Sequence, residues 1–115
     1  MLDNKTTVDA LKDEVRSFIE RREWDKYHNP RDLAMSLSIE AAELLEVFQW
    51  RDSMEIEEKM PELRGRIEEE LADIAIYALS LCIALKTDLS RIIIEKMKKN
   101  EDKYPVDRYK GKAHL

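Results

Sequence analysis

LAMSLSIEAAELLEVFQW, residues 33–50, is the stretch that decides the class of fold. Its apolar residues recur at helical spacing, so one helix face carries the stripe Leu33, Leu37, Leu44 and Val47. Glu40 falls on this stripe, and Glu43 is its neighbour three residues further along. Because an isolated carboxylate is costly to bury, these acids need compensation inside the folded protein.

A second acidic pair lies in the next apolar segment. Glu70 and Asp73 are also three residues apart, and they border the stripe Leu63, Ile67, Leu71, Ile74 and Ala78. If the two segments form neighbouring antiparallel helices, the two pairs can meet. Four converging carboxylates imply raised pKa values, basic partners or a hard divalent cation. The alternative is that they are solvated acids on glutamate-rich helices.

The chemistry of these carboxylates narrows the choice of metal. Ligation by oxygen alone, without His or Cys, selects Mg²⁺ or Mn²⁺ over zinc. One or two such ions also bind the phosphate oxygens of a substrate. The candidate metal ligands are Glu40, Glu43, Glu70 and Asp73.

The composition indicates one all-helical domain. The chain has 115 residues, of which 43% are apolar and 39% charged, with two Gly and three Pro. We expect a single domain over residues 1–115, and an oligomer, because so short a chain needs a second copy to build a deep site. The net charge of −5 argues against general binding to nucleic acid polymers, which depends on clustered Lys and Arg.

Cysteine content and hydropathy indicate a reducing compartment. Cys82 is the one cysteine of the sequence, so no disulfide forms within the chain, and its place in the apolar run 74–85 predicts a packing role. That run has about a dozen residues, whereas a membrane span needs about 20. Residues 1–9 are polar and lack the apolar core of a signal peptide. We expect a cytoplasmic protein without a membrane partner.

Capping signals predict the first two helices. Thr6 or Thr7 caps a first helix that ends near residue 24. Asn29 at the N-cap and Pro30 at the first helical position open a second helix, which runs to about residue 50.

Two further helices are expected in the second half. A third helix with Pro61 in its first turn runs to about residue 85, preceded by a short turn that Asp52 or Ser53 caps, and residues 54–60 are ambiguous. From Ile74 onward this helix is apolar nearly all round, so it is central or contacts another subunit. The candidate caps of a fourth helix, which ends near residue 103, are Thr87, Asp88 and Ser90.

The fourth helix carries a basic stripe and leads into a polar tail, residues 106–115. Lys96, Asn100 and Lys103 follow one another at i, i+4 and i+7, on one helix face. Such a stripe can clamp phosphates. Lysines at a helix C-terminus are also typical of a solvated helix end, where they complement the dipole.

Aromatic side chains offer surfaces on which a flat ligand can stack. These residues are Trp24, Tyr27, His28, Trp50 and Tyr77. Three of them lie at expected helix ends, where ligand pockets often open, and their rings suit a nucleobase. In a protein of this size most aromatic residues belong to the core, and His28 is also typical of a capping or surface histidine.

These segments form an ordered set of motifs along nearly the whole chain. They are Phe18 with Glu23-Trp24, His28-Asn29-Pro30-Arg31, Leu33, Glu40-Ala41-Ala42-Glu43-Leu44, Phe48-Gln49-Trp50, Glu69-Glu70-Leu71-Ala72-Asp73, Tyr77, Lys96-Met97, Asn100 and Lys103-Tyr104-Pro105. The set resembles the all-alpha nucleoside triphosphate pyrophosphohydrolases, the MazG-like superfamily, and most closely its dCTP pyrophosphatase-type branch.

The resemblance implies a four-helix MazG-like bundle completed by dimerisation, as a homodimer or a homotetramer. It implies Mg²⁺-dependent hydrolysis of a nucleoside triphosphate, with dCTP or a modified pyrimidine deoxynucleotide favoured, to the monophosphate and pyrophosphate. The metal ligands and catalytic residues would be Glu40, Glu43, Glu70 and Asp73. The contacts to phosphate or sugar would be Lys96, Asn100 and Lys103. The base and deoxyribose pocket would consist of Trp24, His28, Trp50 and Tyr77.

Two alternatives stay open. In one, the chain is a non-catalytic helical interaction module whose carboxylates pair helices or dock a basic partner. In the other, the same fold acts on a different pyrophosphate substrate, such as phosphoribosyl-ATP. The number of metal ions, and whether Glu40 or Glu43 acts as the general base, are also left open by the sequence.

Overall fold

The computed structural model describes residues 1–112, and in this range the chain is helical without a β-strand. The α-helices are α1 (Val8–Arg21), α2 (Pro30–Phe48), α3 (Ser53–Leu85), α4 (Leu89–Lys103) and α5 (Val106–Tyr109). The short 3₁₀ helices η1 (Leu2–Asn4) and η2 (Asp25–Tyr27) precede α1 and α2. The expected all-α class is confirmed. The last three residues of the expected polar tail lie outside the described range.

Side-chain oxygen atoms cap the first turns of the four long helices. In each case the oxygen accepts a backbone N–H that the helix itself leaves unpaired. The bonds run from Ala10 N to Thr7 Oγ1 (3.0 Å), Asp32 N to Asn29 Oδ1 (2.9 Å), Glu55 N to Asp52 Oδ1 (2.9 Å) and Arg91 N to Asp88 Oδ1 (2.8 Å). The predicted caps Thr7, Asn29 and Asp88 are therefore confirmed.

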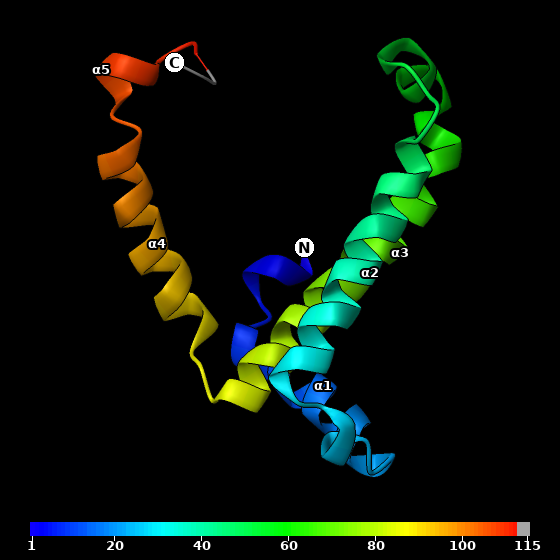
Figure 1. The fold of residues 1–115 in the computed structure, drawn as a ribbon, viewed down its shortest axis with the longest axis vertical. Coiled ribbons are helices and arrows are strands. Elements are labelled where there is room, and N and C mark those ends of the chain that lie inside the picture. Colours follow the sequence, from blue (N-terminus) through cyan, green and yellow to red (C-terminus); the bar gives the residue numbers. More distant parts are fainter. Residues whose placement is uncertain (113–115) are drawn as a thin grey trace.

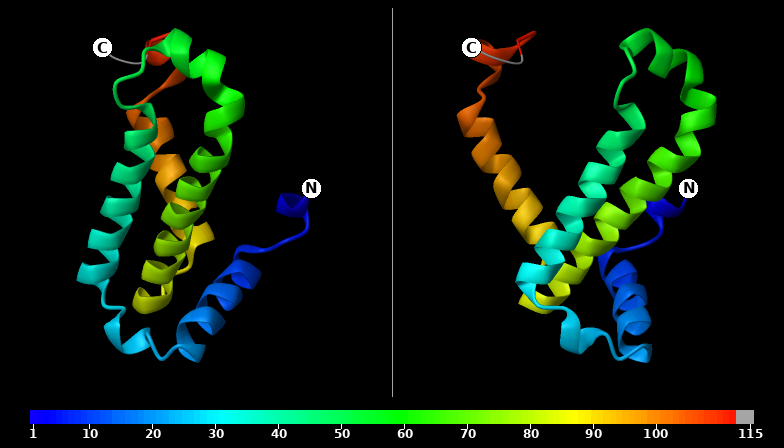
Figure 2. Two further views of the ribbon diagram at one scale, coloured as in Figure 1. Left: turned by 90° about the vertical axis from the view of Figure 1, so that its right-hand side faces the viewer. Right: turned by 45° about the vertical axis from the view of Figure 1, so that its right-hand side comes forward.

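Helix α3 begins well before the expected start near Pro61. Asp52 caps α3 itself instead of a separate turn, and the helix continues through residues 54–60 and through Pro61. A proline inside a helix removes one backbone hydrogen bond, and Figure 2 shows the first turns of α3 curving away from its longer part. The expected boundary was wrong because the upstream cap and the neighbouring turns outweigh this local cost.

The first two helices end slightly earlier than expected. Helix α1 stops at Arg21, and Glu23 then adopts a left-handed conformation with φ of 53°. The backbone N–H of Trp24 donates to the carbonyl oxygen of Ile19 at 3.1 Å, which closes the end of the helix. Helix α2 stops at Phe48, and Trp50 is left-handed with φ of 68°. Both ends are followed by tight turns that redirect the chain.

Helices α2 and α3 form an antiparallel pair, and α1 packs against the C-terminal part of α3 (Figures 1 and 2). The most deeply buried core side chains are Val47 and Leu33 of α2, which are 1% and 2% exposed. Leu79 and Cys82 of α3 and Ile19 of α1 are also buried, so the packing role predicted for Cys82 is confirmed. This three-helix core is the frame on which the acidic residues lie.

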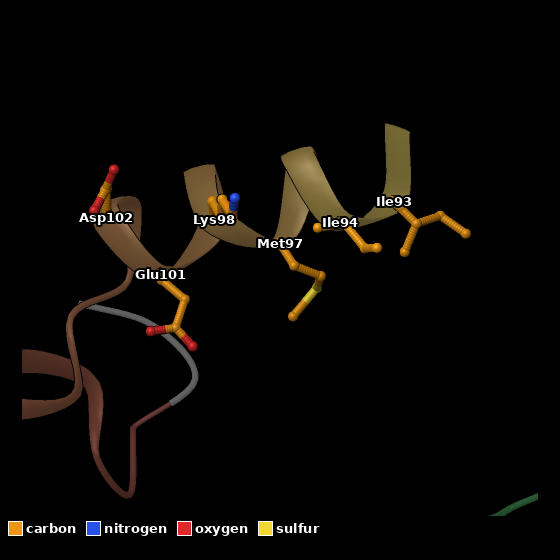
Figure 3. A pocket seen from close by; sticks show the side chains of 6 residues that line it. All are labelled: Ile93, Ile94, Met97, Lys98, Glu101 and Asp102. Carbon is orange, nitrogen blue, oxygen red and sulfur yellow. The ribbon is translucent and has the colours of Figure 1, made fainter. Parts of the chain in front are cut away.

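Helix α4 points away from this frame, so the two parts form a V (Figure 1). Three of its apolar residues, Ile93, Ile94 and Met97, are exposed, and Figure 3 shows them projecting from the helix. A single chain thus packs three long helices together and leaves the fourth apart. Completion of the bundle by a second copy stays a prediction. In residues 1–112, the helices lack the combination of length and apolar character that a membrane crossing requires.

Candidate metal centre and adjacent cavity

Three predicted acidic residues converge at the contact between α2 and α3. Glu40 and Glu43 lie on α2 and Glu70 on α3, and each offers a carboxylate oxygen such that the three atoms lie within 4.8 Å of one another. All three side chains are half-buried. The predicted meeting of the acidic pairs between neighbouring antiparallel helices is confirmed for these residues.

The register of the two helices explains the convergence. Glu46 of α2 and Arg66 of α3 approach to 3.7 Å, which shows which positions of the two helices lie opposite each other near the cluster. Because the helices are antiparallel, moving back toward Glu40 on α2 corresponds to moving forward toward Glu70 on α3. The apolar residues Leu33 and Val47 are buried on either side of the acids along α2, which packs against α3. Packing of the core therefore forces the carboxylates toward each other.

Two oxygen atoms of the cluster are buried without a hydrogen-bond partner. They are Oε2 of Glu40 and Oε2 of Glu70. The ion pairs found in residues 1–112 engage other acids, so within this range no basic side chain compensates the cluster. An unpaired buried oxygen lowers the stability of the fold, because folding removes its hydrogen bonds to water and provides no replacement. The sequence left open raised pKa values, basic partners or a divalent cation as compensation for the acids. For the described residues, basic partners are excluded.

Desolvation and the nearness of other carboxyl groups raise the pKa values of the cluster. Desolvation, followed by the neighbouring carboxyl groups of Glu43 and Asp73, raises the pKa of Glu40 from 4.5 to about 7. Desolvation and then Glu43 also raise the pKa of Glu70. Asp73 itself is exposed and lies outside the close group of three, but its charge acts on both residues. The site therefore resists accumulating negative charge.

A hard divalent cation fits these observations. The donors are carboxylate oxygens from two rigid helices, which is the ligand type that Mg²⁺ and Mn²⁺ prefer. The unpaired oxygen atoms of Glu40 and Glu70 are available as ligands, and a double positive charge would offset the desolvation and the repulsion that raise their pKa values.

A largely apolar cavity of about 520 Å³ lies between α1 and α3. Its walls include three predicted substrate-binding residues, Trp24, His28 and Tyr77. The Nδ1 atom of His28 is buried without a hydrogen-bond partner. A cavity with aromatic walls and a free polar atom is typical of a pocket for a flat organic ligand.

The cavity also contains residues that the sequence argument did not assign to a site. Phe18 lines the cavity and packs edge-on against Trp24, with 5.9 Å between ring centroids. The guanidinium of Arg22, which is not part of the cavity lining, lies 3.6 Å from the Phe18 centroid. Glu14 and Ser80 contribute polar groups to the wall. The spacing of Glu14 and Phe18 at i and i+4 on α1 was the available signal, because it places both on one helix face.

The other predicted binding residues lie elsewhere in the single chain. Trp50 is 92% exposed in the turn between α2 and α3, at the opposite end of the helix pair from α1 (Figure 1). Lys96, Asn100 and Lys103 lie on α4, apart from the α2/α3 pair (Figure 1). One copy thus brings together the acids and part of the aromatic set. The roles of Trp50 and of the α4 stripe stay predictions.

The sequence of this chain is similar to those of known proteins over most of its length. The model of the MazG-like family matches residues 35–114. The chain is 35% identical over 109 residues to dCTP pyrophosphatase 1 of Rattus norvegicus, covering 93% of this chain and 64% of that protein. It is 33% identical over 112 residues to dCTP pyrophosphatase 1 of Bos taurus, covering 96% of this chain and 66% of that protein. The chain therefore spans just under two thirds of the length of these relatives.

A solved structure shares the fold. A pyrophosphatase from Archaeoglobus fulgidus DSM 4304 superposes with a TM-score of 0.80 at 48% sequence identity, covering 84% of this chain and 91% of that one. The family match includes the acidic residues of both helices, and the superposition covers most of the chain. The chain belongs to the MazG-like family.

Proposed function

We propose that this protein is a metal-dependent nucleoside triphosphate pyrophosphohydrolase. The observation that carries the proposal is the convergence of Glu40, Glu43 and Glu70, with two buried unpaired oxygens, close along α3 to a cavity with aromatic walls. The similarity to proteins named pyrophosphatases supports the reaction, and the relatives named dCTP pyrophosphatase 1 support a pyrimidine deoxynucleoside triphosphate as substrate.

Glu40, Glu43, Glu70 and Asp73 would hold Mg²⁺ or Mn²⁺. When bound, the cation supplies positive charge that offsets the repulsion between the acids and a triphosphate and polarises a phosphoryl oxygen. The close group supplies three carboxylates from two helices, and Asp73 contributes a fourth charge nearby. The packing of α2 against α3 holds these side chains in place before the substrate arrives.

The reaction is attack of water on the α-phosphorus. A bond forms between the water oxygen and phosphorus, the bond from the α-phosphorus to the bridging oxygen breaks, and pyrophosphate leaves. The carboxylate of Glu40 or Glu43 accepts the proton of the attacking water, and its half-buried position limits competition from bulk solvent. Replacing Glu40 and Glu43 by Gln one at a time, and following the pH dependence of kcat, identifies which of them is the base.

The aromatic cavity is the proposed place for the base and the deoxyribose. Trp24 and Tyr77 offer ring faces, and Nδ1 of His28 is free to bond a polar edge of the base. Trp50 and the α4 stripe would complete the site in a homodimer or homotetramer. The exposed apolar residues Ile93 and Met97 support this arrangement, because they need a partner surface.

A substrate panel tests the proposal. Purified protein is mixed with Mg²⁺ and each of the deoxynucleoside triphosphates, 5-modified dCTP and phosphoribosyl-ATP, and release of pyrophosphate is measured. We expect pyrophosphate and the monophosphate in equal amounts, with the highest kcat/KM for a pyrimidine deoxynucleotide, and no turnover after chelation of the metal. Absence of turnover on every substrate would favour the non-catalytic interaction module, and turnover of phosphoribosyl-ATP alone would favour the second alternative.

A further inference from the structure

One side chain from the first helix forms a hydrogen bond to the joint between α3 and α4, residues 86–88. The Nζ atom of Lys12, on α1, donates to the carbonyl oxygen of Thr87 at 2.6 Å, across 75 positions of sequence. The other side-chain hydrogen bonds found in residues 1–112 connect positions three or four apart. Lys12 and Thr87 are both half-buried, so water competes only partly for this bond.

The joint has few other restraints. Lys86 is left-handed, with φ of 56°, and its N–H donates to the carbonyl oxygen of Ile83 at 3.2 Å. The N–H of Thr87 donates to the carbonyl oxygen of Cys82 at 2.9 Å, which completes the end of α3. Asp88 then caps α4. These bonds define where each helix ends, but rotation between Thr87 and Asp88 is left to the groups around the joint.

Within one chain, helix α4 gains little orientation from packing. It diverges from the other long helices (Figure 1), and its residues are exposed from Ser90 to Lys99. A hollow of about 420 Å³ lies beside the joint, with Lys12, Arg16 and Lys86 among the residues that line it. In this hollow, Lys12 is the residue that reaches across to the joint itself, whereas Arg16 is bonded to Asp13 on its own helix at 2.6 Å.

We propose that Lys12 is a positioning residue that sets the direction of α4 through its bond to the Thr87 carbonyl. Two interactions stabilise the ammonium group at this position. A charged donor makes a strong hydrogen bond to a carbonyl oxygen, and the C-terminal end of α3 is the negative end of the helix dipole. The consequence for phosphate binding by the stripe Lys96, Asn100 and Lys103 rests on the proposed function. The bond then presents this stripe in a restricted range of orientations before a triphosphate binds.

Distances between α4 and the bundle test the clamp without any assay of activity. Spin labels are attached at Ser38→Cys on α2 and Lys98→Cys on α4, in a Cys82→Ala background. Pulsed electron paramagnetic resonance then measures the distribution of distances between the labels, which reports the spread of α4 orientations. An excess of unlabelled protein limits the signal to pairs within one chain. Lys12→Met keeps the aliphatic stem and removes the donor, Lys12→Arg restores a donor, and Arg16→Met removes a cation from the same hollow.

We expect a broader or shifted distance distribution in Lys12→Met, recovery in Lys12→Arg, and no change in Arg16→Met. Lys12→Leu, which also lacks a donor, is the second variant if Lys12→Met does not fold, and a melting curve of each variant checks the core. A distribution in Lys12→Met that equals that of the parent protein would overturn the inference. An equal broadening in Arg16→Met would overturn it as well, because the effect would then belong to the charge of the hollow.

Steady-state kinetics connect the clamp to the site. If α4 occupies its binding orientation about a tenth as often, KM for the triphosphate rises about tenfold while kcat at saturation is retained. A fall in kcat at constant KM would refute the positioning role. If no substrate is turned over, the proposed function fails, yet the distance distributions still decide whether Lys12 restrains α4. If turnover is normal and the distances do not respond, the clamp fails alone.

Discussion

Glu40 should make metal binding depend strongly on pH between 6 and 8. Desolvation and the nearby carboxyl groups of Glu43 and Asp73 raise its pKa to about 7, and a cation can use this ligand only when it is ionised. From pH 6 to pH 8 the ionised fraction of Glu40 rises from about one tenth to about nine tenths. The apparent affinity for Mg²⁺ should therefore increase about tenfold from this group alone. Glu70, whose pKa is also raised, acts in the same direction.

The stability of the metal-free protein should show the opposite trend. In the unfolded chain Glu40 titrates near 4.5, whereas in the folded protein its pKa is about 7, so between these values the folded state holds the additional proton. Ionisation of the cluster thus costs stability as the pH rises from about 4.5 to 8. Mg²⁺ should restore stability at pH 8 and have much less effect at pH 5.5.

Two measurements check this reasoning. The concentration of free Mn²⁺, measured by electron paramagnetic resonance at pH 6, 7 and 8, gives the apparent metal affinity. Melting curves with and without Mg²⁺ give the change in stability. Glu40→Gln should reduce the contribution of this residue to both pH effects. Glu46→Gln is the matched control, because Glu46 lies on the same helix but pairs with Arg66 at 3.7 Å. Equal metal affinity at pH 6 and pH 8, or an unchanged pH profile in Glu40→Gln, would refute the argument.

Three further tests concern the fold and the site. Glu43→Gln and Asp73→Asn should each keep the helical circular dichroism and lower kcat on the order of 100-fold, and wild-type turnover in both would contradict the ligand assignment. Leu33→Ala should cost about 2 to 5 kcal/mol in urea unfolding, because Leu33 is 2% exposed, whereas Leu45→Ala, at an exposed position of the same helix, should change stability by less than about 0.5 kcal/mol. Trp24→Ala should raise KM about tenfold if its ring stacks on the base, and an unchanged KM would place the base elsewhere.

Local rules were sufficient for much of the fold. A cap is decided by one side chain and the backbone three residues later, so Thr7, Asn29 and Asp88 were readable from the sequence. The acidic convergence was predictable too, since two neighbouring antiparallel helices can bring the polar interruptions of their apolar faces together. Glu40 and Glu70 met for this reason.

Other features depend on contacts that periodicity does not describe. Pro61 indicated a helix start, but it lies inside α3, because the first turns after Asp52 already have helical hydrogen bonding. Leu71 was placed on a core-facing stripe and is 56% exposed, since in one chain only part of the circumference of α3 is covered by α1 and α2. The direction of α4 follows from a joint whose bond to Lys12 crosses 75 positions, and no local pattern encodes such a contact.

The two halves of the proposed site differ in how firmly the chain holds them. The carboxylates lie on α2 and α3, which share the buried residues of the core, so their spacing is fixed before any ligand binds. The α4 stripe is joined to that frame through Lys86 and Thr87, and ordering it costs free energy when substrate binds. Metal affinity should therefore be insensitive to Lys12→Met, while KM for the triphosphate responds to it. This separation follows from the architecture, because a change at the joint does not reach the contact between α2 and α3.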